Sequence, residues 1–391
     1  MIDTIVLTLK KPMFAILDPK KFNPPTNLLY EENNIFGSKS FFKCVQNPSI
    51  AELKNGIYKP RLTVFKRINH QGLKEINLKV EFSAPKLLYL NNFDELDENN
   101  FSELTAKLKL VLKDMGVFIF EKFIKKAPIS AVHYSKNIIF EDYSNPYYYI
   151  SQLKNININK KLDTNQSDYR NDGLSFKYRA NSYEVVFYDK LHDLKQTKIS
   201  PKRSEEKEDN LLQLNILDWI DQKHKKPFEV LRYEIRLNNR QKILQIFKKI
   251  GLDYDLSEIT FSNLFSKEIS KKVLLYFLKE ISDDFNILKS GFGNDYKKIF
   301  FEILFNLNGK ISTALKVFGA YILADKYGQR ELKNILKNQY FNYWYRLKKQ
   351  LFLKQSNSFE TIFSPIIKQI EEFKPVKLEN CKLMINNYKY D

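Results

Sequence analysis

Cysteine, glycine and proline are scarce in this chain of 391 residues, which contains 2 Cys, 11 Gly and 13 Pro. The two cysteines, Cys44 and Cys381, are too few and too far apart for a disulfide framework or a zinc site. The sequence has no Gly-x-x-x-x-Gly-Lys-Ser/Thr loop, so it lacks the P-loop route to ATP hydrolysis. Its 4 histidines form neither a His-x-x-Arg motif nor a His-hydrophobic-His pair, which argues against tyrosine recombinases and two-histidine relaxases.

Long apolar runs are also missing. The longest, such as Val273–Leu278, are far shorter than the ~20 residues that cross a bilayer. The opening segment Met1–Leu9 carries Asp3 and no basic region, so we expect a first strand here and not a signal peptide. These features predict a cytoplasmic protein with no membrane partner.

What the chain does have is positive charge and aromatic side chains. It carries 64 Lys and Arg against 46 Asp and Glu, a net charge of +18, which attracts polyanions. Nucleic acid is the leading expected partner, and an anionic membrane surface is the second. The abundance of Lys, Asn and Ile is also typical of an AT-rich coding bias, which weakens the charge argument. A hydrophobic content of 43%, with 14% aromatic residues, excludes a disordered chain.

The hydrophobic period changes near residue 255. Before it, period-2 alternation dominates, and after it the period is 3.6. We therefore predict an α+β protein: a mostly antiparallel sheet with helices on one face in residues 1–255, and an α-helical DNA-binding or accessory domain in residues 256–391. The strands are expected near 2–9, 38–46, 58–68, 76–84, 129–140, 173–178, 182–190 and 228–237, and the later helices at 265–282, 294–307, 310–325 and 329–354.

The strand at 228–237 is the most informative stretch. Alternation places Leu231, Tyr233, Ile235 and Leu237 on one face and Arg232, Glu234 and Arg236 on the other. A carboxylate between two arginines suits an enzyme that acts on phosphate, and Arg232 and Arg236 are candidate DNA contacts. It is equally typical of a solvated strand face with a cross-strand ion pair.

Two other strands carry metal-binding residue types on their polar faces. These residues are Glu81 and His133, and together with Glu234 they form a candidate ligand set for Mg²⁺ or Mn²⁺. A lone histidine is more often an ordinary structural residue, so the assignment of His133 depends on the other two.

A tyrosine and a lysine share the polar face of the strand at 182–190. Tyr188 and Lys190 lie opposite the apolar residues of that strand, which include Tyr183. A phenol is a weak nucleophile until a cation stabilises its phenolate, and Lys190 or a nearby metal would supply that charge. Tyr169 and Tyr178, in or beside the neighbouring loop and hairpin, are the nearest rivals to Tyr188. The constellation suits transesterification of a DNA strand.

Five segments resemble, in order, parts of the phage/plasmid replication protein gene II/X family, the replication initiators of filamentous phages. They are Met1–Leu9, Lys79–Leu96, Val132–Ile138, Phe187–Lys190 and Leu231–Leu237, and a looser likeness continues through Gly309–Gly319. The resemblance implies rolling-circle initiation in a bacterial host cell. In that process the enzyme nicks one strand at an origin, holds the 5′ end as a phosphotyrosine, frees a 3′-OH as primer, and rejoins the displaced strand.

The same resemblance implies the roles of particular residues and partners. It points to Tyr188 as the nucleophile, to double- and single-stranded origin DNA as substrate, and to host helicase and polymerase as partners. Leu90 and His133 depart from the family pattern, and the second departure makes Asp3 an alternative metal ligand.

The expected helix at 329–354 contains Arg346, Lys348 and Lys349 among interleaved aromatic residues. It is either an amphipathic helix packed by its aromatics or a DNA-contacting face. Two other functions also fit the sequence. One is a non-catalytic origin-binding or regulatory protein, and the other is a polyanion or membrane-surface binder without sequence preference.

Salt dependence of binding tests whether the net charge serves DNA. If the protein neutralises ~6 to 10 phosphates, the logarithm of its affinity should fall steeply and linearly with the logarithm of salt concentration. Charge reversal at Lys348 and Lys349 should weaken binding to all sequences similarly, as measured by fluorescence anisotropy. A flat salt response would show that the charge reflects coding bias alone.

Overall fold

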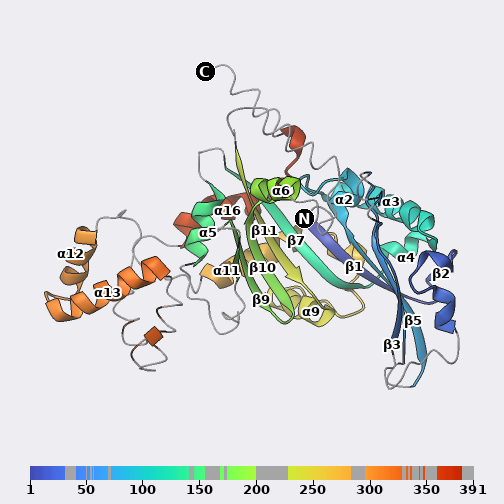
Figure 1. Ribbon diagram of the computed structural model, residues 1–391, viewed down its shortest axis with the longest axis horizontal. Coiled ribbons are helices and arrows are strands. Elements are labelled where there is room, and N and C mark those ends of the chain that lie inside the picture. The colour runs from blue at the N-terminus through green and yellow to red at the C-terminus, as the bar shows by residue number, and fades with distance from the viewer. Residues whose placement is uncertain are drawn as a thin grey trace, which may run out of the picture.

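The structure is a computed structural model in which the predicted α+β class is confirmed. It describes residues 1–30, 41–49, 51–52, 55, 57–68, 72–140, 145–154, 168–170, 174–199, 228–282, 296–327 and 359–380, and positions 332, 335, 336, 343 and 347. In these residues a nine-stranded sheet has the order β3-β4-β5-β1-β7-β11-β10-β9-β8, and neighbouring strands are antiparallel throughout (Figure 1).

The strands lie close to the segments predicted from alternation. Those of the large sheet are β1 (Ile2–Lys10), β3 (Phe41–Gln46), β4 (Arg61–Ile68), β5 (Lys74–Ser83), β7 (Ile129–Phe140), β8 (Asp168–Arg170), β9 (Ser175–Ala180), β10 (Tyr183–Asp189) and β11 (Glu229–Leu237). A separate pair is formed by β2 (Phe14–Ile16) and β6 (Val117–Ile119). Because side chains alternate across a strand, each strand contributes to two chemically different faces.

One face of the sheet is the core, and helices cover it. Tyr233 of β11 is fully buried there, and its hydroxyl donates a hydrogen bond to the Leu274 carbonyl at 3.0 Å. Tyr149 stacks on Phe140 of β7, with 4.6 Å between ring centroids. The helices on this side are α5 (Pro146–Lys154), α9 (Arg240–Lys249), α10 (Phe261–Leu264), α11 (Lys267–Ser282) and α16 (Phe359–Glu372).

The remaining helices lie at the ends of the sheet or beyond it. They are α2 (Ala84–Tyr89), α3 (Phe101–Asp114), α4 (Glu121–Lys125), α6 (Lys190–Ile199), α12 (Tyr296–Asn306) and α13 (Ile311–Tyr327), with short 3₁₀ turns at Pro19–Lys21, Thr26–Tyr30 and Glu98–Asn100. None of the helices within the described ranges combines the length and apolar character that crossing a bilayer requires.

The predicted boundary near 255 does not separate two hydrophobic cores. Helices α10, α11 and α16 lie after it in the sequence, yet their side chains pack in one cluster with the sheet. Helices α12 and α13 form a different cluster around Ile299, Val317 and Tyr321, away from the sheet (Figure 1). The change of period therefore marks the end of the last strand, and the core continues into the helical segment.

Strand β7 extends past the first residue of β1, and side chains complete its hydrogen bonding there. The carboxylate of Glu95 accepts hydrogen bonds from the Asn137 backbone N–H at 2.5 Å and from Lys136 Nζ at 2.7 Å. Further along, the Gln369 amide bonds to both the N–H and the C=O of Ile139, at 2.9 and 2.7 Å. Since buried backbone groups are costly when unpaired, these contacts fasten segment 91–97 and α16 to the sheet.

Two buried tyrosines of the core offer a matched test of stability. Tyr233→Phe removes the hydrogen bond to Leu274 and should lower the free energy of unfolding by ~1 kcal/mol. Tyr134 is equally buried, but its hydroxyl has no hydrogen-bond partner among the described residues. Tyr134→Phe should therefore leave stability unchanged or raise it. Urea unfolding of both variants checks the contrast, and equal losses would contradict this account of the core.

Candidate active site

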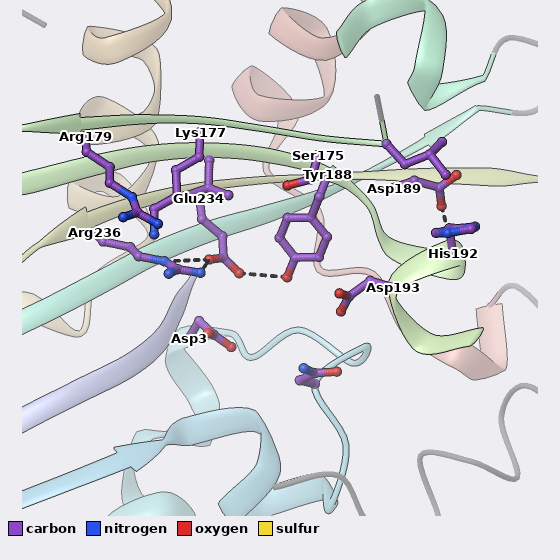
Figure 2. A pocket seen from close by; sticks show the side chains of 13 residues that line it. Asp3, Ser175, Lys177, Arg179, Tyr188, Asp189, His192, Asp193, Glu234 and Arg236 are labelled. Carbon is purple, nitrogen blue, oxygen red and sulfur yellow. Dashed lines mark hydrogen bonds and ion pairs between the residues drawn. The ribbon is translucent and has the colours of Figure 1, made fainter. Parts of the chain in front are cut away.

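The polar face of the sheet carries a site built from β9, β10 and β11. Antiparallel pairing places Tyr188 of β10 directly opposite Ser175 of β9 and Arg232 of β11. The pleat brings Glu234 to the same face, so the side chains of Tyr188 and Glu234 point toward each other (Figure 2). Strand alternation predicted this placement of Tyr188, Arg232, Glu234 and Arg236.

Glu234 is buried and held by both arginines. Its Oε1 lies 2.7 Å from Arg232 Nε, and its Oε2 lies 2.8 Å from Arg236 Nη2. Burial alone would raise the pKa of this carboxyl, but the guanidinium groups of Arg236 and Arg232 hold it well below its usual value. Glu234 is therefore an anion with both oxygens engaged.

Arg232 is a buried centre of hydrogen bonds and ion pairs in this site. Its side chain is only 2% exposed, because it is enclosed by groups from four parts of the chain. Its partners are Glu234, Asp3 Oδ1 at 2.8 Å, Ser135 Oγ at 3.0 Å, and the Asn92 carbonyl and Asn137 Oδ1, both at 3.1 Å. Arg232 therefore offers almost no surface for the predicted DNA contact, whereas Arg236, with a 30% exposed side chain, remains accessible.

The hydroxyl of Tyr188 donates a hydrogen bond to Glu234 Oε1 at 3.0 Å. Burial, and then the negative charge of Glu234, raise the pKa of this phenol well above its usual value. Tyr188 is therefore protonated at neutral pH, and its O–H is oriented by the carboxylate. Among its rivals, Tyr178 and Tyr183 are buried on the apolar face.

Lys190 is the first residue of α6 and not part of the strand. It is fully buried, its Nζ lies 5.8 Å from the centre of the Tyr188 ring, and it donates a hydrogen bond to Asn92 Oδ1 at 2.7 Å. The ammonium group is thus close enough to favour negative charge on the tyrosine.

A cavity of about 410 Å³ opens beside Tyr188. Lys177, Arg179 and Arg236 line one side of it, and Asp193 and His192 line the other (Figure 2). Glu184 holds the Lys177 ammonium at 2.6 Å and Arg236 Nη1 at 3.3 Å. Three cations therefore lie next to an oriented hydroxyl, and they are the groups of this cavity that can hold an oxyanion such as phosphate. Four carboxylates line the same cavity: Asp3, Asp189, Asp193 and Glu234.

The predicted metal ligands do not assemble around one point. Asp3, Glu81 and His133 line a second cavity of about 280 Å³, which also contains Arg61, Lys86 and Arg236. In the described part of the chain, no three His, Cys, Asp or Glu residues are arranged to hold an ion.

The contacts of each predicted ligand explain why the four do not form a metal site. Glu234 and Asp3 pair with Arg232, and Glu81 is 41% exposed beside Lys79. Burial and the charge of Arg236 lower the pKa of His133. The residues present therefore do not fit a Mg²⁺ or Mn²⁺ centre with these ligands.

Lys177 and Arg179 were not named as site residues from the sequence, although the strand pairing expected for the hairpin places them there. The hairpin at 180–183 pairs Lys177 with Val186 and Arg179 with Glu184, so both lie on the face of Tyr188. Arg346, Lys348 and Lys349 lie outside the described residues. No family model, curated protein or solved structure matches this chain.

The pairing of Glu234 with two arginines predicts a pH-dependent stability. A carboxyl whose pKa is lower in the folded than in the unfolded chain stabilises the fold above about pH 4.3, and that contribution is lost as pH falls through the folded pKa. Glu234→Gln should lower the free energy of unfolding at pH 7 by ~3–5 kcal/mol, because it leaves buried arginines without their anion.

Urea unfolding at several pH values measures this effect. The deficit of Glu234→Gln should shrink as the medium becomes acidic enough to protonate Glu234 in the wild type. Glu81→Gln is the matched control, since its side chain is 41% exposed, and it should follow the wild type at every pH. Identical pH profiles for both variants would argue against a buried, charged Glu234.

Proposed function

We propose that this protein nicks one strand of double-stranded DNA at an origin and later rejoins it, with Tyr188 as the nucleophile. The proposal agrees with the resemblance to the gene II/X replication initiators. The observation that carries it is the hydroxyl of Tyr188, oriented at 3.0 Å by Glu234 in a cavity lined by Lys177, Arg179 and Arg236. A backbone phosphate held by these cations lies next to the nucleophile.

The nicking step is a transesterification. Tyr188 Oη attacks the phosphorus, the P–O3′ bond breaks, and the phenolic proton passes to Glu234 Oε1. The departing 3′ oxygen takes a proton from water and becomes the free 3′-OH, while the 5′ end stays on Tyr188 as a phosphotyrosine. In the rejoining step a 3′-OH attacks this phosphotyrosine, and the phenol recovers its proton. Lys190 stabilises the charge that develops on the phenol ring.

Arg236 links phosphate binding to proton transfer. In the free protein it pairs with Glu234 and keeps that carboxylate a weak base. A phosphate that attracts the partly exposed guanidinium weakens this pairing, and the pKa of Glu234 then rises. Arrival of the scissile phosphate thus makes the proton acceptor stronger at the moment it is needed.

DNA in double- and single-stranded form is the proposed substrate, and host helicase and polymerase are the proposed partners. The requirement for Mg²⁺ or Mn²⁺ stays a prediction of the sequence. No step above passes through a metal, because the described residues do not assemble the predicted ligands.

Capture of a covalent adduct tests the proposal. A suicide oligonucleotide with the origin nick site should become linked to the wild-type protein, and mass spectrometry should find the DNA on Tyr188. Tyr188→Phe should bind the same DNA and form no adduct. The assay is run with Mg²⁺, with Mn²⁺ and with a chelator, so that a metal requirement is measured independently of the nucleophile.

Tyr183→Phe is the matched control. Tyr183 lies on the same strand but faces the core, so this variant should form the adduct at close to the wild-type yield. An adduct on any other residue, or none with the wild type, would falsify the assignment of Tyr188. DNA binding without an adduct would instead support a non-catalytic origin-binding protein.

A further inference from the structure

A third cavity, of about 520 Å³, lies on the same polar face toward the other side of the sheet. It is formed over β4, β5, β1 and β7 and bounded by the start of α9. Three kinds of side chain line it: cations, small polar groups and a few apolar groups. They are Lys10, Arg67, Lys79 and Arg240; Thr8, Asn77, Ser130, Asn238 and Asn239; and Met13, Phe65, Pro128 and Ala131.

Asn77 is the unusual residue of this cavity. It lies on β5 directly between Lys10 of β1 and Phe65 of β4, and it is only 1% exposed. Neither its amide nitrogen nor its amide oxygen has a hydrogen-bond partner among the described residues. An unsatisfied buried amide costs free energy that a leucine here would not. Both atoms are covered in the free protein, so a ligand that enters the cavity pairs with them after the Asn77 side chain turns toward it.

The cavity also supplies positive charge and an aromatic ring. None of the described residues that line it is Asp or Glu, although Glu75 holds Arg67 at 3.1 Å and Lys10 at 3.6 Å from outside the lining. The Nε of Arg240 is a second buried donor without a partner in the described residues. Phe65 is half-buried beside Asn77.

These features match the parts of one nucleotide. Aromatic rings stack on bases, cations attract the phosphates on either side, and an asparagine amide pairs with the N6 donor and N7 acceptor of adenine. A free phosphate would satisfy the cations and leave the Asn77 amide unpaired. A nucleotide satisfies both, through its phosphates and its base.

We propose that this cavity binds a single adenine base of single-stranded DNA through Asn77 and Phe65. The inference rests on the proposed function in taking DNA as the ligand. The cavity and Tyr188 lie on one face, with β5 and β10 separated by four strand spacings, or roughly 19 Å across the strands. A strand that crosses this face reaches both, so the base pocket selects which phosphate meets the nucleophile.

Binding of two fluorescent oligonucleotides tests this assignment. One is all-thymidine and the other is identical except for one internal adenine, and both are measured with the Tyr188→Phe protein so that no strand is cut. The adenine should tighten binding about five-fold or more, the lower end of what one bidentate contact provides. Asn77→Leu should abolish this preference and leave affinity for the all-thymidine strand within about two-fold.

Two further variants separate recognition from folding. Thr63→Val changes a polar residue two positions from Phe65 that does not line the cavity, and it should keep the adenine preference. Phe65→Leu should weaken binding of the adenine strand. Thermal melting should show that Asn77→Leu is at least as stable as the parent, because it removes an unsatisfied amide.

The outcomes distinguish this inference from the proposed function. Equal affinity for both strands, or a preference that survives Asn77→Leu, overturns the adenine pocket, whereas the adduct on Tyr188 is unaffected by that result. Failure to bind either strand overturns the pocket and the choice of DNA together. If Asn77→Leu does not fold, retention of the full preference by Phe65→Leu overturns the pocket instead.

Discussion

The buried carboxylate of Glu234, held between Arg232 and Arg236, is the interaction on which the rest of the site depends. Removing an anion from water is expensive unless cations and hydrogen bonds replace the lost solvation, and here two guanidinium groups do so. Arg232 in turn ties β11 to Asp3 of β1, to Ser135 of β7 and to the Asn92 carbonyl. One charged pair thus fixes the relative positions of three strands and a loop, and the Tyr188 hydroxyl takes its orientation from that assembly.

The two faces of the sheet differ in what covers them: helices pack on the apolar face, and much of the polar face is left open for cavities. Helices such as α11 and α16 cover the apolar face, so the stability of the fold does not require a cover over the polar one. Segment 91–97 and α6 close one end of the polar face, where Phe93 and Leu191 pack on Phe228 and Val230. The rest of that face keeps three cavities, each with at least three Lys or Arg side chains in its lining, and the one beside Tyr188 also has four carboxylates. Positive charge is therefore concentrated where an extended polyanion could lie across several strands.

Alternation in the sequence was enough to place most strand residues on the correct face. It put Tyr188 and Glu234 together because both strands are regular and pair directly as antiparallel neighbours. It could not assign strand order: β5 and β11 have β1 and β7 between them, so Glu81 lies roughly 14 Å from Glu234 across the strands, too far for one ion. It also could not reveal Arg232 as the partner of Asp3, since that contact joins residues far apart in sequence. The change in the hydrophobic period near residue 255 separated the strands from the later helices. It carried no information on which of those helices pack in the same core as the sheet.

The protonation states of the site follow from this arrangement and limit its chemistry. Tyr188 has a raised pKa and Glu234 a lowered one, so in the free protein the proton stays on the phenol. Under the proposed function, a phenol that keeps its proton until substrate binds does not react with other electrophiles that enter the cavity. Only a ligand that competes for Arg236 changes the balance, and an anionic phosphate does so while a neutral molecule does not. In the proposed mechanism, the same arginine that neutralises Glu234 in the free protein therefore makes activation of Tyr188 conditional on a bound phosphate.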